Sequence, residues 1–304
     1  MAQHLTLKPG DCATIIAPAS PLRQDDQGLL DEAVRLLESW GLRVKLRVET
    51  EAHFYLAGTD AARAAHLNAA LADPEAKAIF CTCGGYGSPR LLPLIEVAPG
   101  LVPKILVGFS DITALHLGLA RLAPQLTLIH GPNIATGQIL GSEASCRRNQ
   151  QALHAALFDA AYRLDEQVEM LVPGQATGPL TGGCLSLVVS LLGTDWAPRC
   201  DGAILFLEDV GEAPYRIDRM LIQLRNAGAF RDLRGLVFGK MTNCSDPHND
   251  LRDVLLHLFR DAPFPVALDL DCGHGAVNLP LPLGVVAEID GAARRFRLPA
   301  SGRK

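Results

Sequence analysis

The first half of this chain alternates short apolar stretches with longer amphipathic ones, and this alternation constrains the fold more than any other feature of the sequence. The apolar stretches predict strands and the amphipathic stretches predict helices. Predicted strands cover 12–17, 42–48, 77–82, 105–107 and 126–129, and predicted helices cover 25–40, 59–72, 88–97, 111–121 and 143–158. Strands separated by helices of this length form a parallel sheet with helices on both faces. We therefore expect a Rossmann-like α/β domain.

The second half has a different pattern, with short predicted strands at 203–207, 236–238, 265–268 and 285–289 and one clear helix over 214–227. Between the halves, residues 165–181 lose the helical period and are rich in Pro and Gly, which predicts a linker. The expected organisation is an N-terminal α/β domain over 1–164, a linker over 165–181, and a smaller C-terminal α+β domain over 182–304 that is rich in short strands.

Ser110 lies where the predicted strand 105–107 turns sharply into the predicted helix 111–121, with only Gly108 and Phe109 before it. Such a turn holds the side chain out of the sheet and beside unpaired backbone N–H groups at the start of a helix. Exposure, a fixed rotamer and a nearby N–H donor are what a nucleophilic serine requires.

Two interpretations of Ser110 remain open at this point. In the usual nucleophile elbow, G-x-S-x-G, the second glycine would stand where this chain has Ile112, whereas Gly108 fits the first position. The structural alternative is that Ser110 only caps the helix that follows it. Two further turns, Gly84–Gly87 and His130–Asn133, also follow predicted strands. Ligands of parallel sheets gather at the carboxyl ends of the strands, so these three turns predict a site.

A serine nucleophile requires a base, which is usually a histidine held by an acid. His130 and His274 both lie in glycine-containing turns, and His274, between Gly273 and Gly275, is the preferred candidate. For the acid, Glu208 and Asp209 end an apolar strand, where buried carboxylates are costly unless they are paired or used. The structural alternative for these two carboxylates is capping, or ion pairing with Arg216 or Arg219.

Composition excludes several classes of protein. The net charge of −5 and the absence of basic runs argue against nucleic-acid binding. We expect no transmembrane segment and no secretory signal, and therefore a cytoplasmic protein. The eight scattered cysteines contain no C-x-x-C motif, so buried thiols are expected rather than a disulfide framework or a metal site.

Several motifs together resemble the LD-carboxypeptidases, a family of serine peptidases that also contains the microcin C immunity hydrolases. The motifs that carry this resemblance are Gly84–Gly87 (GGYG), Gly108–Asp111 (GFSD), His130–Pro132 (HGP), Thr181–Gly183 (TGG), Leu207–Glu212 (LEDVGE), Tyr215–Arg219 (YRIDR) and Gly273–Gly275 (GHG). They span essentially the whole chain, and as a set they are far more specific than any single motif.

The resemblance implies a Ser-Glu-His triad, which falls on Ser110, Glu208 and His274. It also implies an oxyanion hole formed by the backbone N–H groups of Asp111 and Gly85.

Two positions depart from the family pattern. This chain has Cys83 where the family usually has Arg, and Cys184 where it often has Asn. Both lie near the expected substrate pocket, so they bear on specificity rather than on the triad. The expected substrate contacts come from Gly84, Tyr86 and Arg216.

By this resemblance, the protein hydrolyses the amide between meso-diaminopimelate and the terminal D-Ala of murein tetrapeptides during cytoplasmic wall recycling. Its partner is then a muropeptide with a free C-terminal D-Ala, and no metal or organic cofactor is required. A homodimer is one assembly open to such a chain. Two alternatives remain, namely an immunity-type hydrolase that cleaves an acyl-adenylate mimic and a non-catalytic α/β ligand-binding protein.

Overall fold

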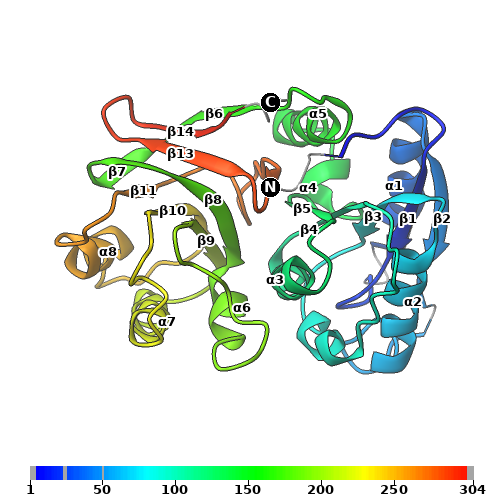
Figure 1. The fold of residues 1–304 in the computed structure, drawn as a ribbon, viewed down its shortest axis with the longest axis horizontal. Coiled ribbons are helices and arrows are strands. Elements are labelled where there is room, and N and C mark those ends of the chain that lie inside the picture. Colours follow the sequence, from blue (N-terminus) through cyan, green and yellow to red (C-terminus); the bar gives the residue numbers. More distant parts are fainter. Residues whose placement is uncertain (1–4, 23–25, 50, 300–304) are drawn as a thin grey trace. The chain divides into compact units, whose positions relative to one another are not determined.

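A computed structural model describes residues 5–22, 26–49 and 51–299 of the chain. The chain divides into two compact units. The N-terminal unit contains the residues up to Ala160 together with Leu279–Pro282, and the C-terminal unit contains Ala161–Asn278 and the residues from Leu283 onward. Each unit is built around its own sheet (Figure 1).

The N-terminal unit contains the predicted parallel sheet. Its strands are β1 (Cys12–Ile16), β2 (Arg43–Arg47), β3 (Ala76–Cys81), β4 (Ile105–Gly108), β5 (Thr127–His130) and β12 (Leu281–Pro282). They are ordered β12-β5-β4-β3-β1-β2. Strands β1 to β5 are parallel to one another, and β12 is antiparallel to β5. Because β3, β4 and β5 are parallel neighbours, the segments that follow them emerge at one edge of the sheet.

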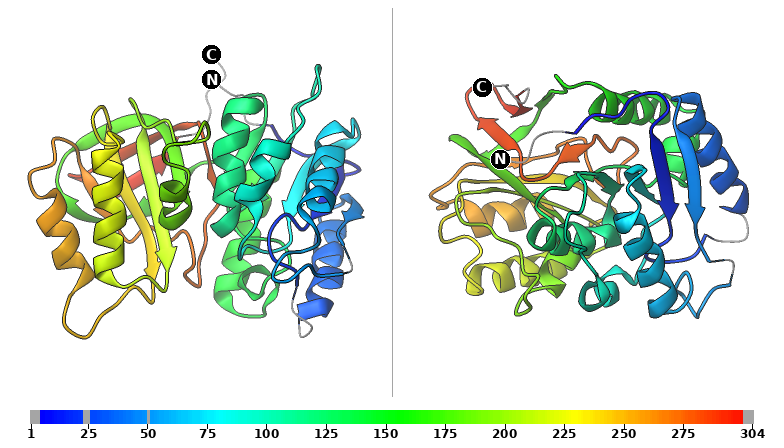
Figure 2. Two further views of the ribbon diagram at one scale, coloured as in Figure 1. Left: turned by 90° about the horizontal axis from the view of Figure 1, so that it is seen from below. Right: turned by 45° about the vertical axis from the view of Figure 1, so that its right-hand side comes forward.

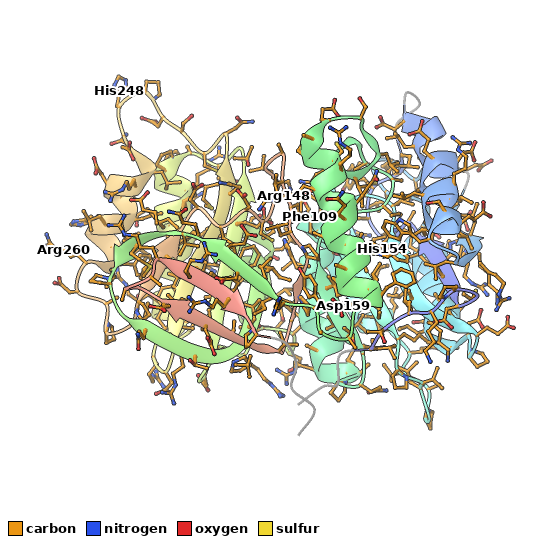
Figure 3. All side chains as sticks on the ribbon, turned by 90° about the horizontal axis from the view of Figure 1, so that it is seen from above. Phe109, Arg148, His154, Asp159, His248 and Arg260 are labelled. Carbon is orange, nitrogen blue, oxygen red and sulfur yellow. The ribbon has the colours of Figure 1, made fainter. Side chains whose placement is uncertain are left out.

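Helices cover both faces of this sheet (Figure 1). They are α1 (Gln27–Ser39), α2 (Asp60–Ala72), the 3₁₀ helices η2 (Ser88–Leu94) and η3 (Ser110–Ile112), α3 (Thr113–Leu122), α4 (Gly137–Leu140) and α5 (Ala144–Phe158). Alternate strand residues, such as Ile15, Phe80 and Val107, pack into one core with α1, α4 and α5. The opposite face is covered by α2 and α3. On α5, His154, which is labelled in Figure 3, stacks on Phe158 with 4.5 Å between ring centroids.

The C-terminal unit is a mixed sheet with helices α6 (Leu185–Ser190), α7 (Pro214–Asn226) and α8 (Leu251–Phe259) (Figures 1 and 2). Its strands are β6 (Leu164–Gln167), β7 (Glu169–Val172), β8 (Gln175–Cys184), β9 (Ile204–Val210), β10 (Gly235–Thr242), β11 (Val266–Leu268), β13 (Val286–Asp290) and β14 (Arg295–Leu298). The order is β6-β14-β13-β8-β9-β10-β11-β7. Strands β8 to β11 are parallel, and the remaining pairs are antiparallel.

The predicted linker over 165–181 is wrong, because these residues form β6, β7 and most of β8. Gly178 and Pro179 lie inside β8, whereas Pro173 and Gly174 form the short connection between β7 and β8. Gly178, for example, faces Gly202, whose carbonyl oxygen would lie 2.6 Å from a Cβ at position 178. The helix α8 was also missed, although Asp250 caps it by accepting a hydrogen bond from Arg252 N–H at 2.7 Å.

Other differences are small. The predicted helix over 25–40 begins at Asp25, outside the described residues, and α1 begins at Gln27. The predicted helix over 111–121 is a 3₁₀ turn followed by α3. No disulfide joins the eight cysteines. Within residues 5–22, 26–49 and 51–299, no helix has the length and apolar character needed to cross a membrane.

Candidate active site

Ser110 occupies a strained turn at the end of β4. Its φ angle is +64°, in the left-handed region that residues with a Cβ rarely adopt. Non-glycine residues in this region cost about 1–3 kcal/mol and cluster at functional sites. A serine that only caps a helix has extended backbone, and here the residue at the N-cap position of η3 is Phe109. The backbone therefore favours the nucleophile elbow over the simple cap.

The turn before Ser110 is held by a buried asparagine. Asn133 Oδ1 accepts a hydrogen bond from Phe109 N–H at 3.2 Å, and Asn133 Nδ2 donates to Phe109 O at 3.4 Å. Phe109 is labelled in Figure 3. Gly108 is required for this approach, because a Cβ there would lie 3.0 Å from Asn133 Oδ1 and 2.9 Å from Ile112 Cγ2. Asn133 comes from the HGPN turn after β5, so two of the three predicted turns meet here.

The glycine loop after β3 lies directly against the serine. A Cβ at Gly84 would lie 2.8 Å from Ser110 Cβ and 3.5 Å from the Asp111 nitrogen. Gly85 has a φ of +100°, which only glycine adopts readily. The structure thus brings Gly84 against Ser110 and Asp111, and Gly85 and Tyr86 follow Gly84 in the same loop.

Asp111 ties the end of the glycine loop to the elbow. Its Oδ2 accepts a hydrogen bond from Ser88 N–H at 2.7 Å, and Ser88 Oγ donates to the Asp111 carbonyl oxygen. The carboxyl group is buried. Burial raises the pKa of Asp111, although the hydrogen bonds from Ser88 oppose this effect. Asp111 therefore has a structural role for its side chain in addition to the backbone N–H that was predicted as an oxyanion donor.

The C-terminal unit contains the acid and the base in contact with each other. His274 Nδ1 lies 2.6 Å from Glu208 Oε2, and His274 N–H donates to the same oxygen at 3.1 Å. Glu208 is fully buried at the end of β9, and 17% of the His274 side chain is exposed. An oriented imidazole on a buried carboxylate is the arrangement that supports proton transfer at the other ring nitrogen.

The charge of Glu208 governs the ionisation of His274. Burial alone would lower the His274 pKa, but the hydrogen bond and the negative charge of Glu208 outweigh burial and raise it. For Glu208, burial raises the pKa while the hydrogen bond from His274 opposes the rise. The carboxylate thus stabilises the imidazolium that forms whenever His274 accepts a proton.

Glycine and asparagine position this pair. A Cβ at Gly273, whose φ is +105°, would lie 2.4 Å from Glu208 Oε2, so only glycine allows the contact. The Oδ1 of the buried Asn278 accepts a hydrogen bond from Gly273 N–H at 2.9 Å and fixes the turn that carries His274. No role was predicted for the side chains of Asn133, Ser88 or Asn278. A polar residue beside a glycine-containing turn was the available sequence signal for each.

Asp209 has the capping role that was the alternative for both carboxylates. Its Oδ2 accepts from Ser186 N–H in the first turn of α6 at 2.8 Å. The thiol of Cys184, one of the two departures from the family pattern, lies 3.6 Å from Asp209 Oδ1. Ion pairing of Glu208 with Arg216 or Arg219 is wrong, because the partner of Glu208 is His274.

Arg216 and His130 have surroundings of their own. Arg216 is exposed on α7 and pairs with Glu212 at 3.5 Å, so its contact with substrate remains a prediction. His130 is fully buried in β5, and its ring packs edge-on against Phe109 at 5.8 Å between centroids. It is therefore a buried residue that packs against the turn before Ser110.

Within the described part of the chain, no three His, Cys, Asp or Glu side chains are grouped so that they could hold a metal ion.

A strained serine after a parallel strand and a buried carboxylate–imidazole pair are the components of a serine hydrolase. Comparison with known proteins agrees with this class. Residues 14–131 match the family model of the LD-carboxypeptidase N-terminal domain, and residues 177–289 match that of the LD-carboxypeptidase C-terminal domain. The chain belongs to the LD-carboxypeptidase family, and it is a carboxypeptidase by class.

Named relatives extend along nearly the whole chain. The murein tetrapeptide carboxypeptidase of Pseudomonas aeruginosa is 35% identical over 298 residues, covering 93% of this chain and 94% of that protein. The structure of muramoyltetrapeptide carboxypeptidase from Oxalobacter formigenes has a TM-score of 0.81 at 26% identity, covering 94% of this chain and 97% of that one. The microcin C7 self-immunity protein MccF in complex with aspartyl sulfamoyl adenosine shares the fold, with a TM-score of 0.87 at 22% identity and 98% of each chain covered.

Proposed function

We propose that this protein removes the terminal D-Ala from murein tetrapeptides by hydrolysing the amide that joins it to meso-diaminopimelate, in the cytoplasm and during wall recycling. The observation that carries the proposal is the left-handed φ of Ser110 at the end of β4 in a chain that also holds the Glu208–His274 pair. The named relatives supply the substrate, because a 35% identical protein is called a murein tetrapeptide carboxypeptidase.

In the proposed mechanism, Ser110 Oγ attacks the scissile carbonyl carbon while His274 Nε2 accepts the hydroxyl proton. Nδ1 of the same ring is engaged by Glu208, which holds the ring orientation and stabilises the imidazolium. The N–H groups of Asp111 and Gly85 bind the oxyanion of the tetrahedral intermediate. His274 then gives the proton to the amine of the departing D-Ala, and water releases the acyl group from Ser110 by the reverse sequence.

The route of the chain supports joint action of the two halves. Only residues 275–278 separate His274 from Leu279–Pro282, which belong to the N-terminal unit. Within that segment Leu281 pairs with His130, and His130 pairs with Gly108, two residues before Ser110. Such a short covalent connection favours a histidine that serves the serine of its own chain.

The test is incubation with purified murein tetrapeptide, with sugar-linked and free forms assayed separately. Mass spectrometry should show conversion to the tripeptide with release of one D-Ala, and a tetrapeptide ending in L-Ala should remain intact. An aspartyl sulfamoyl adenosine substrate is assayed in parallel. Cleavage of that compound with no release of D-Ala would overturn the proposal in favour of the immunity-type alternative.

A further inference from the structure

Ser20 makes a hydrogen-bonded clamp on the glycine loop. It lies in the turn after β1 and is half-buried. Its N–H donates to the Gly84 carbonyl oxygen at 3.2 Å, and its Oγ accepts from Tyr86 N–H at 3.1 Å. A third bond runs back from the loop, since the Cys83 thiol donates to the Ser20 carbonyl oxygen at 3.1 Å. All these residues belong to the N-terminal unit.

The first of these bonds fixes the direction of the Gly85 N–H. The Gly84 carbonyl and the Gly85 N–H belong to one peptide group, which is planar, and in a trans peptide the two point in opposite directions. The backbone of the described residues contains no cis peptide. Because Ser20 N–H holds the Gly84 oxygen, the Gly85 N–H is directed away from Ser20.

The second bond holds the next peptide group, between Gly85 and Tyr86, with its N–H directed toward Ser20. Tyr86 N–H points at Ser20 Oγ, so it is taken up by the clamp and does not compete as an oxyanion donor. The packing is close, because a Cβ at Gly85 would lie 2.2 Å from Ser20 Oγ and 2.7 Å from Ser20 Cβ. Two glycines in succession would otherwise allow either peptide to rotate, which would turn a carbonyl toward the developing negative charge.

The far end of the loop is held independently of Ser20. The buried guanidinium of Arg63 donates to the Gly87 oxygen at 3.0 Å, and Asp111 binds Ser88 N–H at 2.7 Å. These contacts fix residues 87 and 88. Loss of the Ser20 hydroxyl should therefore change the peptide at residues 85–86 and leave the rest of the loop in place.

We infer that Ser20 is a positioning residue of the oxyanion hole. Its N–H orients the Gly84–Gly85 peptide and its hydroxyl fixes the Gly85–Tyr86 peptide, so Gly85 is held on both sides and its N–H can serve as a donor. This inference rests on the proposed function, because it assigns Ser20 a role in the reaction of Ser110. It also gives Cys83, the other departure from the family pattern, a structural role in holding the Ser20 turn.

The experiment compares Ser20→Ala, Ser20→Thr and Ser110→Ala with the wild type, using D-Ala release from murein tetrapeptide. Ser20→Ala removes the bond to Tyr86 N–H and keeps the bond from Ser20 N–H to the Gly84 oxygen, so it frees Gly85 on one side only. It should lower kcat about tenfold with KM within about twofold, which is less than the cost of about 10²–10³-fold for complete loss of an oxyanion donor. Ser20→Thr keeps the hydroxyl and should restore most of kcat. Ser39→Ala is the matched control, since Ser39 Oγ donates to Leu36 O within α1, and it should match the wild type.

Thermal unfolding of each variant separates orientation from simple loss of structure. A drop in kcat at unchanged KM and unchanged Tm, with recovery in Ser20→Thr, supports the inference. Wild-type kcat in Ser20→Ala, or a rise in KM alone, would overturn it while an inactive Ser110→Ala leaves the proposed function standing. Turnover that persists in Ser110→Ala would instead overturn the proposed function.

Discussion

The two halves of the candidate site are built by different physical means. The serine half is assembled from backbone geometry, namely a left-handed φ at Ser110, a glycine loop packed against it, and hydrogen bonds between Asn133 and Phe109 and between Ser88 and Asp111. The acid–base half joins Glu208 and His274, which are 66 positions apart, through one short contact in a buried environment. One half depends on conformation, the other on charge.

This difference predicts how each half should respond to substitution. Backbone geometry tolerates removal of the serine hydroxyl, because the turn is held by other residues. A buried carboxylate–imidazole pair tolerates neither loss of the carboxylate charge nor added volume. Without the carboxylate the imidazolium formed during the reaction is not stabilised, and a displaced imidazole leaves a buried charge without its partner. Substitutions that remove only a reacting group should therefore lower kcat and leave Tm unchanged. Substitutions that displace Glu208 or His274 should lower kcat by moving a catalytic group.

The largest effect is expected for Ser110→Ala. The hydroxyl supplies the nucleophile and little packing, so kcat should fall about 10⁴-fold or more while Tm and substrate binding stay near wild type. Steady-state kinetics, calorimetric titration with tetrapeptide and thermal unfolding measure the three quantities. Activity within tenfold of wild type would remove Ser110 as the nucleophile.

Glu208→Gln tests the acid–base half, because it removes the carboxylate charge and keeps the shape of the side chain. By analogy with triads that lose their acid, kcat should fall about 10³- to 10⁴-fold. In the wild type, His274 must be neutral to act as the base, so kcat/KM should rise with pH through a midpoint above 6.5, the ordinary histidine pKa.

In Glu208→Gln the burial of His274 remains and the opposing charge is gone. The His274 pKa should therefore fall, and the midpoint of the residual activity should move below that of the wild type. A pH–rate profile of both proteins checks this shift. A midpoint that stays in place would show that the profile reports some group other than His274.

A pair of glycine substitutions tests displacement in the acid–base half. Gly273→Ala places a Cβ 2.4 Å from Glu208 Oε2, whereas Gly202→Ala, also at positive φ and in the same unit, meets nothing within 4 Å. Misplacement of a catalytic group by about 1 Å can cost 10²-fold, so Gly273→Ala should lose about that much kcat. Gly202→Ala pays only backbone strain and should keep its kcat. Equal activities in the two variants would contradict the close contact.

The smallest effect, none, is expected from metal removal. Every step of the proposed reaction is assigned to side chains and backbone N–H groups, and none is assigned to a metal ion. EDTA treatment followed by dialysis should leave kcat and KM unchanged. Loss of activity that a divalent ion restores would replace the serine mechanism with a metal-dependent one.

The two halves also differ in how far the sequence could predict them. The elbow is local, since strand, turn and serine are contiguous over residues 105–110, so hydrophobic pattern and glycine placement predicted the turn. They left the role of Ser110 open between a nucleophile and a helix cap. The pairing of Glu208 with His274 depends on β10 lying beside β9 and on a β-bridge between Gly273 and Lys240 of β10, which no local pattern specifies. There the family resemblance supplied the assignment that residue patterns left open between His130 and His274.

The missed strands have a physical reason as well. Residues 165–181 carry Pro173, Gly174, Gly178 and Pro179, which are ordinary signals for a loop. In the structure β8 lies between β13 and β9 in the sheet, and its glycines allow neighbouring backbone to come close. Tertiary packing overrides local preference in this segment, and that packing is absent from any short window of sequence.

The measurement that tests the central claim most directly is the kinetic comparison of His274→Ala, Ser110→Ala, the double variant and His130→Ala. The claim is that Ser110 and the Glu208–His274 pair form one proton-transfer unit, and removal of any member already removes the unit. His274→Ala should therefore lose as much kcat as Ser110→Ala, and the double variant should be no worse than either. His130→Ala should show a smaller loss, because His130 packs beneath the elbow. An inactive His130→Ala beside a His274→Ala that keeps most of its turnover would contradict the account.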